Sequence, residues 1–196
     1  MTGPGRDSVT ESSIKVARVA AANFGGEVRV NRYYDQGKVN SIDILDCVDR
    51  PVLSLTTYST VTLHGTVNVL EGADVRVELL GVAASSASRF PNMLCQAALC
   101  VIKQHWLCAP GVIFPGLLTE YSLSNTLPHL MWISPFLWDE LGEAEIFPDF
   151  RVHWLMALPI SDEEREFVAE NGFNEFEKVL EDADVEYYDL GRRSLV

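Results

Sequence analysis

His129–Trp138 (HLMWISPFLW) and Arg151–Ser161 (RVHWLMALPIS) are the two stretches that decide the fold. Each is shorter than the ~20 consecutive apolar residues that a helix needs to span a bilayer. Both are rich in aromatic and branched side chains, which favour buried strands. The two stretches therefore predict two central strands of a sheet, against which the rest of the chain packs.

The segment between these stretches, WDELGEAEIFPDF, crowds carboxylates around Gly142 and Pro148. This composition predicts an exposed acidic connection. Aromatic side chains among carboxylates are what the hot spot of a basic partner would contact. The alternative is that these aromatic side chains tuck under the connection and serve only its structure. The candidate partner-binding residues are Trp138, Asp139, Glu140, Glu143 and Glu145, with Tyr121 from the preceding loop.

Helix signals lie near both ends of the chain. Ser8 with Glu11 forms a capping-box pattern before a helix that ends at Gly25, and Ser161 with Glu164 repeats this pattern before a helix that ends at Gly172. A buried helix is expected after Pro91, and a short last helix after Gly172. The apolar face of the first helix is expected to comprise Ile14, Ala17, Ala21 and Phe24.

Further strands are expected from alternating apolar residues. Their ranges are 27–33, 41–49, 52–63, 75–83 and 112–114.

Composition and charge limit the classes of protein. The chain has 196 residues without a Pro/Gly/Ser-rich linker, so we expect one domain over residues 8–196 after a flexible tail, residues 1–7. Its 47% hydrophobic residues are enough for a large core. The net charge of −13 repels nucleic acid and anionic membranes, whereas it attracts a basic protein partner.

Sequence motifs for catalysis are missing. The four cysteines form no C-x-x-C pair, and the N-terminus lacks the basic region and apolar core of a secretion signal, which predicts buried thiols and a cytoplasmic location. No histidine has metal-binding spacing, although His129 and His153 could face each other across strands. A cysteine nucleophile with His105 is the enzymatic alternative. We expect a non-enzymatic protein without a cofactor or metal.

The order of these signals resembles the Suppressor of fused domain family over Ser41–Ser194. The similar stretches are SIDIL, TTYSTV, VRVELLG, the apolar helix, HLMWISPFLW, PISDEE with the later Asn-Gly-Phe, and the closing DLGRRS. Thr60–Val69 (TVTLHGTVNV) departs from the family's pattern, because similar proteins often carry a glycine-serine turn there. The resemblance implies an α+β fold with a single mixed, mostly antiparallel sheet flanked by helices, as an α/β sandwich.

The resemblance also implies a function. Stand-alone bacterial relatives look like immunity proteins or antitoxins that bind a cognate toxin, and the acidic charge suits a basic toxin. The alternative is a peptide-binding adaptor or regulator that captures an extended ligand strand at a sheet edge. Either function implies a protein partner and no catalytic site.

Overall fold

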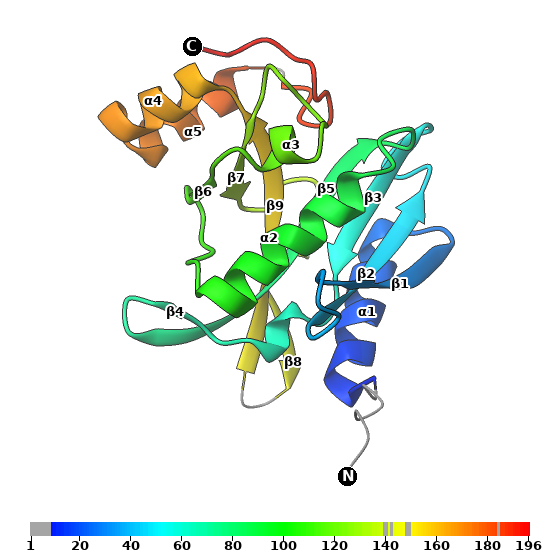
Figure 1. Ribbon diagram of the computed structural model, residues 1–196. Helices are drawn as coiled ribbons and strands as arrows, with labels where there is room; N and C mark the ends of the chain where they lie inside the picture. Colours follow the sequence, from blue (N-terminus) through cyan, green and yellow to red (C-terminus); the bar gives the residue numbers. More distant parts are fainter. Residues whose placement is uncertain (1–8, 139–140, 142, 148–149, 184) are drawn as a thin grey trace.

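A single sheet contains all nine strands of the described residues. The computed structural model describes residues 9–138, 141, 143–147, 150–183 and 185–196. The strand order is β1-β2-β3-β5-β9-β7-β6, with β4 paired to β5 and β8 paired to β9. The β5–β9 pair is parallel and the other pairs are antiparallel, which confirms the predicted mixed, mostly antiparallel α+β sheet (Figure 1).

The bounds of the strands are β1 (Val28–Tyr34), β2 (Ser41–Val48), β3 (Leu55–Thr60), β4 (Asn68–Leu70), β5 (Ala73–Ala84), β6 (Ile113–Phe114), β7 (His129–Ile133), β8 (Glu143–Phe147) and β9 (Phe150–Ile160). The helices are α1 (Glu11–Phe24), α2 (Phe90–Gln104), α3 (Leu117–Glu120), α4 (Asp162–Asn171) and α5 (Phe173–Asp182), with one 3-10 turn, η1 (Leu63–Gly65). The predicted tail, residues 1–7, lies outside the described residues.

The two apolar stretches predict two central strands. Strand β9 lies inside the sheet between β5 and β7, whereas β7 lies beside the short edge strand β6, so only β9 of these two is central. Successive side chains of a strand point to opposite faces, and in β9 both faces are buried. Leu155 and Ala157 pack in the cluster that contains α2, while Trp154 and Met156 pack in the cluster on the other face. Two-sided burial explains why the sequence of β9 is apolar without alternation.

The first apolar stretch was predicted to be a strand as far as Trp138, which is wrong beyond Ile133. Strand β7 ends there, and the chain leaves the sheet through Ser134 and Pro135. Proline has no backbone N–H to give to a ladder, so it does not continue an inner strand.

Helices cover both faces of the sheet. Helix α2 runs across one face in Figure 1, and its Phe90 lies directly over Gly81 of β5, where a Cβ atom would come within 2.7 Å of the ring. The opposite face is covered by α1, through Val16 and Phe24, and by α5, through Phe176. Glycine at position 81 therefore lets α2 approach the sheet closely.

The N-terminal helix differs in detail from the prediction. The predicted cap, Ser8, lies outside the described residues, and the described helix begins at Glu11 after Thr10, whose hydroxyl accepts from the Ser13 amide at 3.1 Å. The face that packs on the sheet is centred on Val16, Ala20 and Phe24, whereas Ile14 is 41% exposed. The helical periodicity of the apolar residues identified an apolar face of α1, but the rotation of the helix about its own axis depends on how it packs on the sheet.

The acidic segment between β7 and β9 was predicted to be a connection only, and this is wrong. Its residues Glu143–Phe147 form β8, which pairs antiparallel with β9, so that Glu143 is opposite His153 and Phe147 opposite Phe150. Strand β7 pairs with the second half of β9, from Met156 to Ile160. Strand β7 therefore leaves the backbone groups along one edge of the first half of β9 without a partner, and β8 pairs with them.

The C-terminal segment is tied to α4 by a buried ion pair. Arg192 donates from Nη1 to Glu164 Oε1 at 2.6 Å and from Nη2 to Glu164 Oε2 at 3.0 Å and to the Pro159 carbonyl at 2.7 Å. Glu164 also accepts from the Ser161 amide at 2.8 Å, which completes the predicted capping box of α4. One carboxylate therefore joins β9, α4 and the C-terminal segment.

Removal of this arginine is expected to destabilise the protein. Arg192→Met leaves the buried Glu164 carboxylate without its cation, which costs about 3–5 kcal/mol in such pairs. Urea unfolding measures the free energy of unfolding. The matched control is Arg193→Met, because Arg193 is exposed. Equal losses in the two variants would contradict a special role for the Arg192 pair.

Candidate functional site

Two of the predicted partner-binding residues are partly or wholly buried. Trp138 is 8% exposed, and its ring packs on Phe24 with 5.0 Å between the ring centroids, so it serves the structural alternative that the sequence left open. Tyr121 follows α3 and lines a pocket of about 530 Å³ together with Asp35 and Lys103. Burial, and then the charge of Glu120, raise the pKa of the Tyr121 hydroxyl.

The predicted acidic residues lie in another part of the molecule. Glu143 and Glu145 belong to β8, where their backbones are opposite His153 and Arg151 of β9. Asp139 and Glu140 lie outside the described residues. Figure 1 shows β8 and α3 at opposite ends of the sheet, so the structure does not bring Tyr121 together with the β8 residues. Their part in partner binding stays a prediction.

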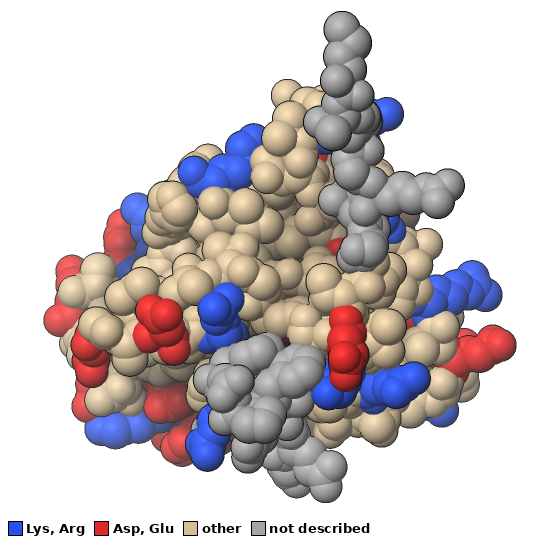
Figure 2. Space-filling model, turned by 90° about the horizontal axis from the view of Figure 1, so that it is seen from below, with Lys and Arg blue, Asp and Glu red and all other residues tan. Residues whose placement is uncertain are grey.

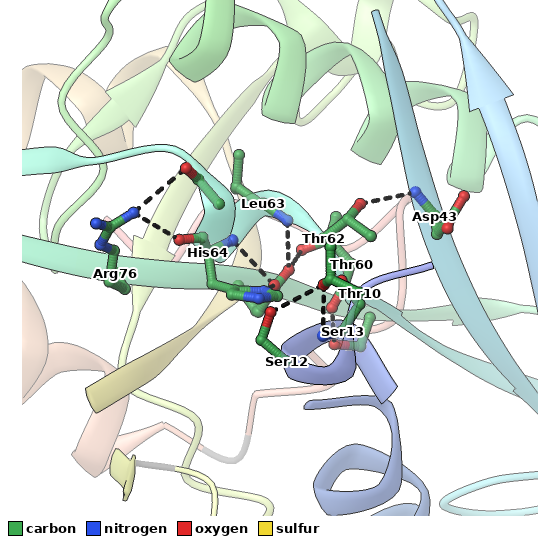
Figure 3. Close-up of polar contacts among 12 residues, drawn as sticks. Thr10, Ser12, Ser13, Asp43, Thr60, Thr62, Leu63, His64 and Arg76 are labelled. Carbon is green, nitrogen blue, oxygen red and sulfur yellow. Dashed lines mark hydrogen bonds and ion pairs between the residues drawn. The ribbon is translucent and has the colours of Figure 1, made fainter. Parts of the chain in front are cut away.

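A buried carboxylate that sequence reasoning missed organises the segment after β3. Glu78 of β5 is 0% exposed, and its carboxylate accepts from the Leu63 amide at 3.2 Å, the His64 amide at 3.0 Å and His64 Nδ1 at 2.6 Å (Figure 3). The Thr60 hydroxyl accepts from the Leu79 amide at 2.8 Å and donates to Glu78. These four donors compensate the burial of the carboxylate and hold η1 against β5.

His64 pairs with Glu78 in the interior, and no histidine motif of the sequence indicated this pair. His64 is 4% exposed, and fourteen positions separate it from its carboxylate, so no spacing motif could show the pair. The available signal was Glu78 itself, which stands between Val77 and Leu79 at the start of the apolar half of β5. The segment held in this way contains the residues of Thr60–Val69 that depart from the family's pattern.

The His64 side chain also lines a polar pocket of about 380 Å³, with Arg32, Arg76 and the start of α1. Arg76 donates to the carbonyls of His64 and Gly65 at 3.0 and 3.3 Å, while Arg32 makes a two-point ion pair with Asp43 at 2.6 and 2.8 Å. Figure 3 places the hydroxyls of Thr10, Ser12 and Ser13 beside His64, and they bond to one another at 2.7 and 2.9 Å. These contacts bind one segment of the chain to another, which is a stabilising role.

The cysteines are poor nucleophiles. All four are free and buried, as expected. Burial, and then the charge of Asp35, raise the pKa of Cys95 to about 11, and burial raises the pKa of Cys108 well above its ordinary value. His105 is exposed while Cys108 is 1% exposed. A nucleophilic cysteine needs a lowered pKa, so these thiols do not suit the enzymatic alternative.

Two further findings bear on ligands. Within the part of the chain that the structure describes, no three His, Cys, Asp or Glu side chains gather closely enough to hold a metal ion. No helix of that part is long and apolar enough to cross a membrane. The described side chains thus offer no metal centre.

The negative charge is confined to one part of the sequence. Residues 1–110 contain ten acidic and ten basic residues, whereas residues 111–196 contain eighteen acidic and five basic ones. The whole net charge of −13 therefore comes from the second part. Its exposed acidic residues on and after α4 and α5, called here the acidic face, are Asp162, Glu163, Glu166, Glu170, Glu175, Glu177, Glu181, Asp182, Glu186 and Asp189.

The other end of the molecule has a mixed charge. Figure 2 views the end that carries β4, β8 and the start of α1, where lysines and arginines alternate with aspartates and glutamates outside the grey region. Figure 1 shows α4 and α5 at the end far from β8 and the start of α1, beside the C-terminus. The molecule is therefore electrically asymmetric, with the acidic face at one end.

Exposed aromatic residues lie next to the acidic face, and the sequence did not identify them. Phe136 is 57% exposed, and its ring meets Tyr187 edge-on with 5.3 Å between centroids. Tyr187 in turn contacts Tyr188 at 5.3 Å. The sequence placed Phe136 within a buried strand and named Trp138 as a candidate contact, whereas in the structure Phe136 is exposed and Trp138 is 8% exposed.

Comparison with known proteins identifies the family. The pattern of the family described as Suppressor of fused protein matches residues 38–193. The chain belongs to the Suppressor of fused family. Its sequence is 35% identical over 190 residues to Immunity protein YqcF of Bacillus subtilis (strain 168), an alignment that covers 96% of this chain and 99% of YqcF. The resemblance that the sequence motifs indicated is thus confirmed.

Solved structures show the same fold. A Suppressor of fused homolog from Neisseria gonorrhoeae FA 1090 superimposes with a TM-score of 0.76 at 14% identity, over 95% of this chain and 97% of the homolog. The structure of the Sufu-Fu complex gives a TM-score of 0.62 at 13% identity, over 93% of this chain and 90% of the matched chain. At such low identity, these likenesses show the Suppressor of fused fold alone.

A structural role for the Glu78 cluster in this Suppressor of fused domain can be tested. Glu78→Gln replaces one acceptor oxygen by an amide donor that faces other donors, which is expected to lower the free energy of unfolding by about 1–3 kcal/mol. Glu71→Gln, at an exposed position, is the matched control. A Glu78→Gln variant as stable as the control in urea would show that the cluster does not hold the segment.

The raised thiol pKa values predict slow alkylation. At pH 8 the native thiols remain protonated, and only a thiolate reacts, so iodoacetamide should modify Cys95 and Cys108 far more slowly than in the urea-unfolded chain. Because the rate follows the thiolate fraction, the native rate for Cys95 should keep rising with pH until about 11, instead of levelling off near the ordinary thiol value of 9.0. Mass spectrometry of labelled peptides measures both rates. Fast labelling of the native protein at pH 8 would contradict the buried, protonated state.

Proposed function

We propose that this chain is a non-enzymatic immunity protein that binds a cognate toxin and neutralises it in the cytoplasm. The observation that carries the proposal is the 35% identity to Immunity protein YqcF along nearly the whole of both chains. Because the alignment covers 99% of YqcF, the whole of that protein has a counterpart in this chain. The buried pairs of Glu78 with His64 and of Glu164 with Arg192 hold parts of the fold together, which supports binding as the activity.

The acidic face supports a basic partner. Ten exposed carboxylates at one end of the molecule create a negative potential, which speeds the approach of a positively charged surface and orients it. The helices that carry them are firmly anchored, since Glu164 joins α4 to the C-terminal segment and Phe176 fixes α5 to the core. Charges on a rigid support lose little entropy when a partner binds.

The second candidate is a regulator that captures an extended peptide at a sheet edge. Strand β1 is an edge strand of seven residues, and its Val30 and Tyr34 are 50% and 51% exposed. An edge of this kind offers free backbone groups to a ligand strand. Such binding depends on backbone hydrogen bonds and should persist at high salt, whereas steering by the acidic face weakens as salt rises.

The test of the proposal uses the genes beside the one that encodes this chain. A neighbouring gene product that stops bacterial growth when expressed alone should lose this effect when this chain is expressed with it, and the two purified proteins should form a complex. Growth arrest that is the same with and without this chain contradicts the proposal. Absence of any toxic neighbouring product also counts against it.

Charge neutralisation on the acidic face should slow association. The triple variant Glu166→Gln, Glu170→Gln and Glu175→Gln is expected to lower the association rate constant about threefold to tenfold at low salt, with a smaller salt dependence than the parent. The control removes three exposed charges elsewhere, by Glu27→Gln, Glu71→Gln and Asp74→Asn. Stopped-flow mixing with the toxin measures the rates. Equal effects of the two variants would remove the acidic face from the encounter.

A further inference from the structure

An apolar groove of about 320 Å³ opens beside the acidic face. It lies between α5, the end of β7 and the segment that follows α5. Its lining residues are mostly apolar. They come from four parts of the chain that are far apart in the sequence. We call Ser134, Phe136, Leu158, Leu180 and Tyr187 the groove residues.

The groove leaves apolar side chains in contact with water. Phe136 is 57% exposed, although its neighbour Pro135 is buried, and the edge-on contact with Tyr187 holds its ring at the mouth of the groove. Tyr187 is half-buried, and this burial raises the pKa of its hydroxyl. A rigid aromatic pair beside a hollow is the kind of surface that receives a partner's anchor side chain.

The rim of the groove is negative. Glu177 and Glu181 are exposed, line the groove and lie one helical turn apart on α5. The lysine of this helix, Lys178, follows Glu177 in the sequence but pairs with Glu175, at 2.7 Å. An uncharged apolar ligand would partly desolvate these carboxylates without compensation. A ligand that brings its own cations would pair with them instead.

The volume limits what enters. About 320 Å³ is at the lower end of the ~300–1,000 Å³ range of small-molecule pockets, so it suits one large side chain. We propose that this groove receives an aromatic side chain of a protein partner, flanked in the partner's sequence by lysine or arginine residues that pair with Glu177 and Glu181. This proposal rests on the proposed function for the biological partner, but the recognition itself can be tested without a toxin.

Short peptides test the recognition directly. The probe is acetyl-Lys-Lys-Trp-Lys-Lys-amide, titrated into the isotope-labelled full chain and followed by chemical-shift changes of the backbone amides. Shifts should centre on the groove residues, and the Kd should be about tenfold lower than for the same peptide with serine in place of tryptophan. A peptide with glutamates in place of the lysines should bind more weakly still. Equal affinity of the tryptophan and serine peptides would overturn the proposal.

Variants of the chain locate the binding site. Ser134→Trp fills the groove from an exposed position and should raise the Kd of the tryptophan peptide about tenfold or more. Phe136→Ala, which removes an exposed ring, should do so less strongly. The matched control is Val69→Ala, because Val69 is 59% exposed and lies on β4. Unchanged affinity of both groove variants, with shifts elsewhere on the protein, would overturn the assignment of the groove.

The rim has its own variant. The parent should prefer the lysine-bearing tryptophan peptide over a neutral one with serines in place of the lysines. The double variant Glu177→Gln and Glu181→Gln should reduce this preference, whereas the control Glu27→Gln and Glu71→Gln should leave it unchanged.

The toxin assay then separates the groove proposal from the proposed immunity function. If Ser134→Trp protects fully and binds the toxin as tightly as the parent does, the groove is not the anchor site, but the immunity function stands. Lack of protection by the parent chain would overturn the immunity function, while the peptide titrations would still decide the groove.

Discussion

The burial of β9 on both faces is the constraint on which the rest of the structure depends. Its side chains point alternately into two cores, and neither core can exist unless helices cover both faces of the sheet. Strand β9 is also parallel to β5, so the connection between them must cross the sheet, and it contains α2, which covers one face. Helices α1 and α5 then cover the other face. The layers thus follow from one strand.

The same arrangement explains how an acidic surface can sit on a stable fold. Helices α4 and α5 follow β9 directly, so their position is fixed by the central strand, by the Ser161 capping box and by the Arg192–Glu164 pair. Their outer sides are free to carry repelling carboxylates, because the binding of α5 to the core depends on Phe176. Stability and charge are thereby separated between the two sides of one helix pair.

The polar groups buried within the fold have a different role. Glu78 and Glu164 are both fully buried, and each accepts hydrogen bonds from segments that are distant in sequence. In each case a carboxylate fixes a part of the chain that lacks a regular ladder: η1 in one case and the C-terminal segment in the other. A loop with an unusual sequence, such as Thr60–Val69, can therefore keep one conformation because its amides have a buried acceptor.

The sequence by itself determined the elements whose signals are local. The apolar stretches of β7 and β9, the capping box of α4 and the glycine that ends it are contained within a few residues, and so is the family's motif order. Only the tertiary structure decided that Trp138 is buried while Phe136 is exposed, that Glu143–Phe147 pairs as a strand, and that His64 meets Glu78. Each of these depends on contacts between distant parts of the chain, which neither periodicity nor composition can report.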